Sequence, residues 1–309
     1  MSYMKHFFII AVFFLFSSSF AQSQVLYGAA TGQVNGNQPS SLYMLNPDTG
    51  SATLIGPIGF NGVTGLEFLP DGRLIGSANA DDNVSVIAVL IEIDRNTGAG
   101  SLIGILGNND IENECARMPD IAYDSNSGRL FGYSDSCFGD IEGLNLINPN
   151  NADVTVIGPS GFEDGGNALA VRSNGTIFGT PIDADGLIRL NRNTGAGTVI
   201  PASIGNVPNA INAMDFNPNT GVLFGSFKDF DDIIGNGSRE SYLVTINTDN
   251  GDLTIVGQTI LGLDAIVFFD DHQFISSVPT LSEYALIATA LLLLAGSVLV
   301  LRRRQKLSV

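Results

Sequence analysis

The segment Leu90-Ile-Glu-Ile-Asp-Arg-Asn-Thr-Gly98 recurs along the sequence in close variants, and this recurrence predicts the fold of the chain. In each copy a short apolar stretch precedes a turn rich in Asn, Asp and Gly, residue types that tolerate the backbone angles of hairpin turns. The other turns are Asn46–Gly50, Asn148–Ala152, Asn191–Gly195 and Asn247–Gly251. Recurrence of this kind indicates repeated β-structure.

Each turn belongs to a unit of four predicted strands. The first strand contains an apolar triplet ending in glycine, and the triplets end at Gly28, Gly76, Gly132, Gly179 and Gly225. The second strand precedes the Asn-rich turn. The third strand ends in Gly56, Gly104, Gly158 and Gly257, with Pro201 in the remaining unit. The fourth strand leads into a tight turn, except in the last unit.

Five units of four antiparallel strands, each too small to bury its own faces, predict an all-β chain with a five-bladed β-propeller over residues 24–272. Six blades and a twisted β-sandwich are the alternatives. The Leu90–Gly98 turn resembles those of generic bacterial β-propeller repeats, which says little about function. If the first strand of each unit is innermost, the channel is lined by small hydroxyl groups and carries almost no charge.

The charge distribution restricts the partners. The chain has 309 residues and a net charge of -17. Five of the 14 Lys and Arg residues and one of the 31 Asp and Glu residues lie in the two terminal segments, so the body has nine basic and 30 acidic residues. Because a phosphate backbone repels such a surface, nucleic-acid binding is excluded.

The N-terminal segment, residues 1–21, predicts a signal peptide. Lys5 precedes the apolar run Phe7–Phe16, and small side chains at Ser19 and Ala21 suit a signal peptidase. We therefore expect the body to be exported.

The C-terminal segment predicts a transmembrane helix over residues 284–301, which are 18 residues without a charge. The basic tail that follows, residues 302–309, places the cytoplasm at the C-terminus. Its first residues are Arg302, Arg303 and Arg304. Residues 273–283 form a linker and a motif ahead of the helix.

The motif before this helix reads Val278, Pro279, Thr280, Leu281, Ser282 and Glu283. With the helix and the Arg cluster it resembles the bacterial IPTL-CTERM sorting signal, from which it departs by Val278 in place of Ile and Tyr284-Ala285 in place of Trp-Gly. The resemblance implies processing by an exosortase-type enzyme in a Gram-negative bacterium. It further implies an inner-membrane-anchored precursor that becomes a cell-surface or extracellular protein.

Cys115 and Cys137 are the two cysteines, and export makes a disulfide between them the expected state. Cys115 falls between the third and fourth strands of unit two. Cys137 falls between the first and second strands of unit three. In an antiparallel repeat these two connections open on the same face of neighbouring units.

Acidic loops on the same face suggest a Ca²⁺ site, because Ca²⁺ needs six to eight oxygen ligands. The candidate ligands are Asp183, Asp185, Asp229, Asp231 and Asp232, with Asp81 and Asp82 nearby in the repeat. Solvated acidic loops that keep the protein soluble are the alternative. Apart from possible Ca²⁺, no cofactor is indicated. A single histidine in the mature chain, His272, disfavours a Ser-His-Asp or multi-histidine site.

These observations favour an exported, non-enzymatic binding or scaffold module. The expected ligand is a polysaccharide or a surface protein. The alternative is a Ca²⁺-dependent extracellular hydrolase or lyase with its site at the propeller channel.

Overall fold

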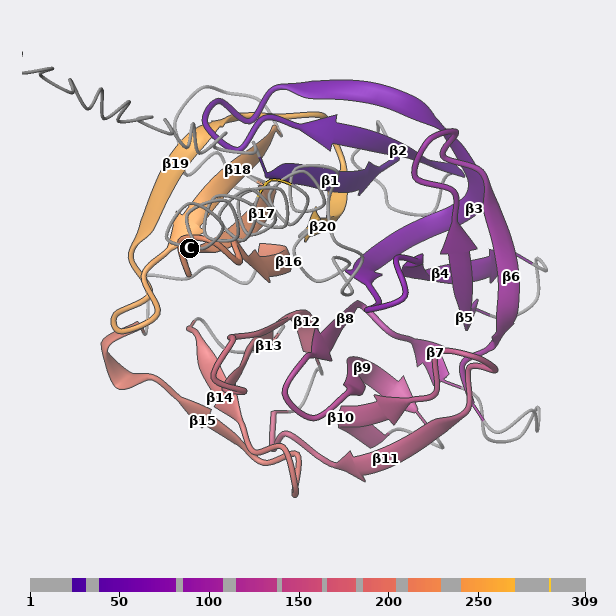
Figure 1. The fold of residues 1–309 in the computed structure, drawn as a ribbon. Helices are drawn as coiled ribbons and strands as arrows, with labels where there is room; N and C mark the ends of the chain where they lie inside the picture. The colour runs from indigo at the N-terminus through magenta and orange to yellow at the C-terminus, as the bar shows by residue number, and fades with distance from the viewer. Residues whose placement is uncertain are drawn as a thin grey trace, which may run out of the picture.

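The computed structural model describes residues 24–31, 39–81, 86–107, 115–137, 141–162, 166–181, 186–203, 211–228, 240–269 and 289. Over these residues the chain is an all-β, propeller-like ring of antiparallel sheets (Figure 1). Its first strands are β1 (Val25–Ala30), β2 (Pro39–Leu45), β3 (Ala52–Phe68), β4 (Leu74–Asp81), β5 (Val86–Ile93), β6 (Gly100–Ile105), β7 (Cys115–Arg117), β8 (Asp120–Asp124), β9 (Arg129–Cys137) and β10 (Ile141–Ile147). The later strands are β11 (Val154–Gly158), β12 (Gly166–Val171), β13 (Ile177–Pro181), β14 (Ile188–Leu190), β15 (Gly197–Val199), β16 (Ile211–Phe216), β17 (Leu223–Lys228), β18 (Ser241–Ile246), β19 (Leu253–Gln258) and β20 (Leu263–Phe269).

The strands pair in four-stranded groups. One sheet has the order β20-β1-β2-β3-β4-β5-β6, because the long strand β3 pairs with β2 through its first half and with β4 through its second. The next group is β8-β9-β10-β11, with β7 also paired to β9. Two further sheets follow, β12-β13-β14-β15 and β16-β17-β18-β19.

Five strands form a closed ring at the centre. The second half of β3 contacts β8, which contacts β12, which contacts β16, which contacts β20, which returns to β3 (Figure 1). The last strand of the fold also pairs with the first, so that Val25 lies opposite Phe269. Both ends of the described body therefore leave the ring at one point.

The central strands are the fourth strands of the sequence units, so the expectation that the first strands line the channel was wrong. A cyclic repeat has the same strand order whichever strand is innermost, and the sequence pattern does not distinguish these arrangements. The first strands of the units lie one place further out. Their glycines make room for packed side chains, since a Cβ on Gly28 would lie 2.7 Å from Leu263 and one on Gly132 would lie 2.5 Å from Met118.

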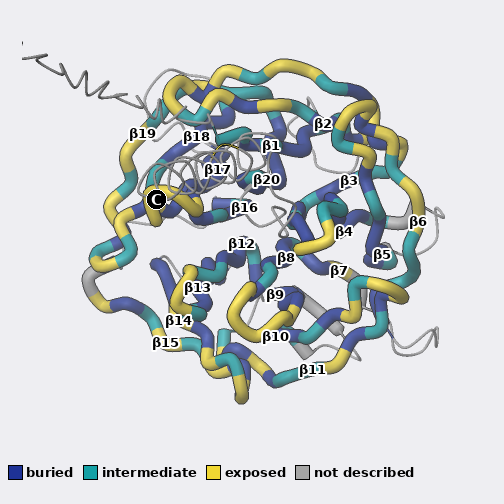
Figure 2. Tube along the Cα trace, viewed as in Figure 1, coloured by how far each residue is buried: buried dark blue, intermediate teal, exposed yellow. Residues whose placement is uncertain are grey.

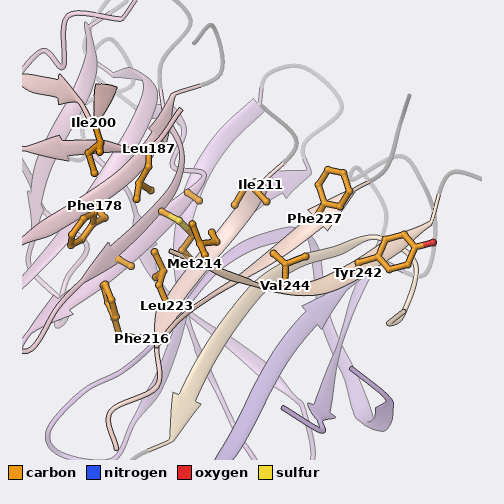
Figure 3. Packing of buried hydrophobic residues seen from close by; sticks show 13 residues of the cluster. Phe178, Leu187, Ile200, Ile211, Met214, Phe216, Leu223, Phe227, Tyr242 and Val244 are labelled. Atoms are coloured by element: carbon orange, nitrogen blue, oxygen red, sulfur yellow. The ribbon is translucent and has the colours of Figure 1, made fainter. Parts of the chain in front are cut away.

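The hydrophobic core lies between neighbouring groups. The described buried residues form five clusters, and each joins side chains from two adjacent groups. In the cluster of Figure 3, Phe178 of β13 and Phe216 of β16 pack with ring centroids 5.7 Å apart. The outer rim of the ring is more exposed than its centre (Figure 2).

Two repeated glycines meet between neighbouring groups at the rim. The glycine that ends one outer strand lies against the Asn-rich turn of the next group, so a Cβ on Gly56 would overlap the carbonyl oxygen of Thr97. Gly158 meets Thr194 in the same way, and Gly257 meets Thr49. Gly104 meets the turn ending at Ala152, which has a φ of 64° where the other units have glycine. The glycines that mark the repeat therefore hold neighbouring groups at close backbone distance.

We expect Gly257→Ala to lower the free energy of unfolding by about 3 kcal/mol, because its Cβ has no space against backbone atoms that cannot rotate away. Gly221→Ala is the matched control. Gly221 has a φ of 69°, but no atom lies within 4 Å of the position that a Cβ would take, so we expect a loss of about 1 kcal/mol from backbone strain alone. Chemical denaturation measures both. Equal losses would contradict the close contact between groups.

Candidate functional site

A cavity of about 220 Å³ lies at the centre of the ring. It is bounded by the ends of β3, β8, β12, β16 and β20 and by the turns that follow three of them. Its lining residues are Glu67, Phe68, Tyr123, Ser125, Val171, Arg172, Ser173, Asp215, Phe216, Asn217, Pro218, Gly221 and Phe268. We call the end of the ring where this cavity opens the turn face. It carries the turns 46–51, 69–73, 94–99, 124–128, 148–153, 172–176, 191–196, 217–222 and 247–252.

Glu67 of β3 joins two central strands at this cavity. The backbone N–H of Phe68 donates to Oε1 of Glu67 at 2.7 Å, and that of Tyr123 in β8 donates to Oε2 at 2.7 Å. Both oxygens of the carboxyl group therefore accept a backbone hydrogen bond.

Asp215 of β16 makes the same kind of hydrogen bonds between the last two central strands, β16 and β20. The backbone N–H of Phe216 donates to Oδ1 of Asp215 at 2.7 Å, and that of Phe268 in β20 donates to Oδ2 at 2.6 Å. The two cavity carboxyl groups thus bind the central strands of neighbouring groups to one another.

Asp120 of β8 makes a third connection, deeper in the ring and buried from solvent. Its Oδ1 accepts from the backbone N–H of Ile121 at 2.9 Å. Its Oδ2 accepts from Leu169 of β12 at 2.9 Å and from Met214 of β16 at 3.3 Å. One carboxyl group therefore contacts three of the five central strands.

Burial raises the pKa of all three carboxyl groups. The pKa of Asp215 rises to about 7, and those of Glu67 and Asp120 rise well above their ordinary values. The negative charge of Asp215 raises the pKa of Glu67 further, whereas the backbone hydrogen bonds act in the opposite direction. At neutral pH these groups hold protons more strongly than exposed carboxyl groups do.

A second polar cluster lies toward the opposite end of the channel. Nζ of Lys228 forms an ion pair with Oδ1 of Asp264, and both side chains are almost fully buried. Asn212 donates to Asp264 at 3.4 Å and accepts from Asn167 at 3.1 Å. Burial raises the pKa of Asp264, and the Lys228 charge opposes that rise.

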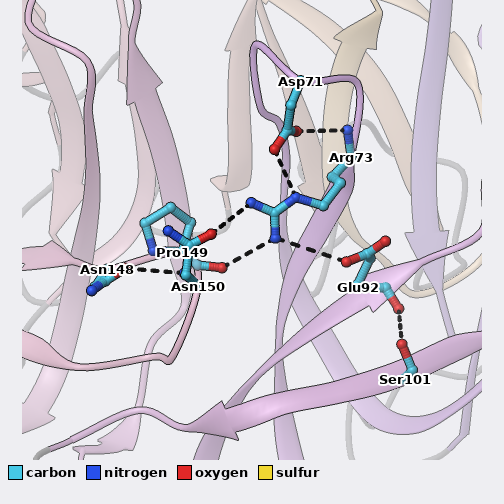
Figure 4. Close-up of polar contacts among 7 residues, drawn as sticks. All are labelled: Asp71, Arg73, Glu92, Ser101, Asn148, Pro149 and Asn150. Carbon is cyan, nitrogen blue, oxygen red and sulfur yellow. Dashed lines mark hydrogen bonds and ion pairs between the residues drawn. The ribbon is translucent and has the colours of Figure 1, made fainter.

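Arginines on the turn face connect neighbouring groups. Arg73 contacts Asp71 at 2.9 Å within its own group and Asn150 at 3.0 Å in the next one (Figure 4). Arg172 donates to Thr248 at 2.5 Å, and Arg192 forms an ion pair with Asp124. In the same way Arg95 lies over the ring of Phe269, 4.5 Å from its centroid.

The sequence analysis did not identify the central carboxyl groups. Glu67 and Asp215 stand singly among apolar residues in the fourth strands, within Leu66-Glu67-Phe68 and Met214-Asp215-Phe216. A lone acid flanked by apolar residues in a strand is the signal that would have found them. The acidic runs that suggested a Ca²⁺ site do not include these residues.

The structure places the two cysteines of the predicted disulfide opposite one another on paired strands. Cys115 at the start of β7 is the antiparallel register partner of Cys137 at the end of β9. This backbone arrangement fits the predicted disulfide, which stays a prediction because the two side chains are not among those described.

The predicted Ca²⁺ ligands Asp183, Asp185, Asp229, Asp231 and Asp232 lie outside the described residues, as do Asp82 and His272. Within the described part of the chain, no three His, Cys, Asp or Glu side chains are grouped to hold a metal ion. Ca²⁺ binding by the acidic loops stays a prediction from the sequence.

Comparison with protein families locates one signature. Residues 276–305 match the IPTL-CTERM motif. This match includes the residues from Val278 to Arg304 that carried the resemblance and lies outside the described residues apart from Thr289. Among the described residues, no helix has the length and apolar character needed to cross a bilayer.

No curated protein sequence matches the chain. The solved structures similar to it are β-propeller-like proteins. One is a nidogen/laminin complex, with 12% identity over 80% of this chain and 86% of that chain and a TM-score of 0.49. A gluconolactonase of Xanthomonas campestris has 11% identity over 82% of each chain and a TM-score of 0.48. A putative 6-phosphogluconolactonase of Bacteroides fragilis has 10% identity over 82% of this chain and 99% of that chain, with a TM-score of 0.46. Similarity at this level carries no inference about activity.

We expect the stability of the protein to fall as pH rises from 5 to 8. Asp215 binds its proton more strongly in the folded state, so the stability it contributes is complete below its unfolded pKa and is lost as pH rises through about 7. This group alone changes the free energy of unfolding by about 1 kcal/mol per pH unit over that range.

The Asp215→Asn variant tests whether Asp215 causes this pH dependence of stability. It removes the titrating group and leaves one of the two backbone N–H donors without an oxygen acceptor. Denaturation at several pH values should show a less steep pH dependence and a loss of about 1 kcal/mol at pH 5. Asp249→Asn, in an exposed turn, is the control and should retain the wild-type slope. An unchanged slope in Asp215→Asn would refute the assignment.

The cysteine pair makes a separate prediction. Non-reducing peptide mapping should recover Cys115 and Cys137 in one linked peptide, and reduction should lower the free energy of unfolding by about 3 kcal/mol, the value for a closed loop of this size. The double variant Cys115→Ser/Cys137→Ser should match the reduced protein. Two free thiols in the native protein would contradict the pairing.

Proposed function

We propose that this chain is an exported, surface-sorted propeller protein that acts as a non-enzymatic binding or scaffold module. The observation that carries the proposal is the IPTL-CTERM match over residues 276–305, which begins seven residues after the closing strand β20 ends at Phe269. A sorting signal so close to the end of the fold leaves the whole ring to be displayed as one body.

The proposed domain, residues 24–272, is a propeller of five blades. The blades are β20-β1-β2 with the first half of β3, the second half of β3 with β4-β5-β6, then β8-β9-β10-β11, β12-β13-β14-β15 and β16-β17-β18-β19. Support comes from the five central strands that contact one another in a closed ring, and from one hydrophobic cluster at each junction.

The proposed terminal segments determine where the body goes. Residues 1–21 act as a signal peptide, and residues 284–301 hold the precursor in the inner membrane with residues 302–309 in the cytoplasm. An exosortase-type enzyme then cleaves near Pro279 and Thr280, within the linker and motif of residues 273–283. The body becomes a cell-surface or extracellular protein of a Gram-negative bacterium.

Two observations support binding rather than catalysis. The four oxygens of Glu67 and Asp215 each accept a backbone hydrogen bond, so these groups are held as parts of the frame. The cavity they line, about 220 Å³, is smaller than the roughly 300–1,000 Å³ of most small-molecule pockets. A single side chain or sugar unit of a larger partner suits this volume, in agreement with a surface protein or a polysaccharide as ligand.

The mature protein should therefore end near Pro279 and lack the C-terminal helix. Intact-mass spectrometry of protein from its native host tests this, and Pro279→Ala/Thr280→Ala should instead accumulate in the membrane fraction at full length. Pro218→Ala, in an exposed turn of the propeller, is the control and should be processed normally. A native species that retains Val309 would refute the sorting role.

A further inference from the structure

The two ends of the described body leave the ring at the turn face. Strand β20 ends at Phe269 beside the start of β1, and Val25 is the register partner of Phe269. Phe268 lines the central cavity, and Phe269 lines a wider hollow next to Arg95. The chain therefore begins its path toward the sorting motif next to the mouth of the cavity.

The connection to the predicted membrane helix is short. Residues 270–283 separate Phe269 from the helix, and 14 residues span at most about 50 Å when fully extended. The folded body, residues 24–272, is itself about 45 Å across, from the usual dependence of the radius of gyration on chain length. The point where the chain leaves the ring must therefore stay within about one body diameter of the membrane.

The excess of acidic over basic residues is smaller at the turn face than at the opposite end of the ring. Seven aspartates lie in the turns of the turn face, but five of the nine basic residues of the body lie on or beside it and offset much of that charge. The basic residues are Arg73, Arg95, Arg129, Arg172 and Arg192, and the aspartates are Asp48, Asp71, Asp94, Asp124, Asp153, Asp249 and Asp252. The acidic sequence clusters 81–82, 183–185 and 229–232 instead follow the far ends of β4, β13 and β17. An anionic lipid surface repels the acidic end more strongly than the turn face.

From these observations we infer that the turn face is directed toward an anionic bilayer while the tail anchors the precursor, and that the acidic end is displayed outward. The inference rests on the proposed sorting function, since it needs the anchored precursor. It adds that the central cavity opens toward the lipid until cleavage releases the body. A partner outside the anchored precursor thus meets the acidic end first.

Fluorescence quenching by lipid tests this orientation. The full-length precursor is reconstituted in vesicles of phosphatidylethanolamine and phosphatidylglycerol that contain a headgroup-attached quencher. Asn193→Cys carries the dye on the turn face, and Gln258→Cys carries it at the opposite end of β19. Both positions are exposed. Labelling of the wild-type chain measures the background from Cys115 and Cys137.

We expect a greater loss of fluorescence at Asn193→Cys than at Gln258→Cys in vesicles, and equal fluorescence in detergent without quencher. An equal loss at the two positions, or a greater loss at Gln258→Cys, overturns the inference. Carbonate extraction of the same vesicles tests the anchoring of the precursor separately from its orientation. A precursor that resists extraction is anchored whatever its orientation, whereas one that is extracted refutes the anchoring and the inference with it.

Discussion

The close approach between an outer-strand glycine and the turn of the next group is the constraint on which this ring depends. At Gly56, Gly158 and Gly257 the neighbouring turn lies where a side chain would begin. At these junctions the close approach of the sheets at the rim accompanies a hydrophobic cluster between the groups. With Gly104 against Asn151 and Ala152, the same contact recurs at four of the five junctions and sets the distance across which the cores there are packed.

The centre of the ring poses a different problem, because each innermost strand presents an unpaired edge of backbone N–H groups. An unsatisfied buried N–H is costly, and central strands have no further strand to pair with. Glu67, Asp120 and Asp215 supply acceptors to amides of neighbouring central strands. Their raised pKa values reflect the cost of burying a carboxylate charge. The rest of the core carries little charge because both faces of each sheet are buried.

Much of the architecture was predictable from the sequence because turn chemistry is local. A turn such as Asn191–Gly195 predicts a hairpin from its own residues alone. The spacing of such turns along the chain predicts four strands per unit. Which strand is innermost was not predictable, since it depends on how Phe269 pairs with Val25 at the end of the chain. The central carboxyl groups were missed for a related reason: Asp120 acquires its partners from strands about 50 and 90 residues away in sequence, and a local pattern does not reveal them.

The position of β20 relates the fold to the sorting signal. This strand is both the innermost strand of its group and the partner of β1, so the ring cannot close before the chain has been made as far as Phe269. The IPTL-CTERM match begins seven residues later. Closure by the final strand therefore places the tail at a defined point of a complete ring, beside the N-terminal strand and the cavity. A tail attached to an outer strand would leave from the rim, whereas the described part of this chain ends at Phe269, directly after a residue that lines the central cavity.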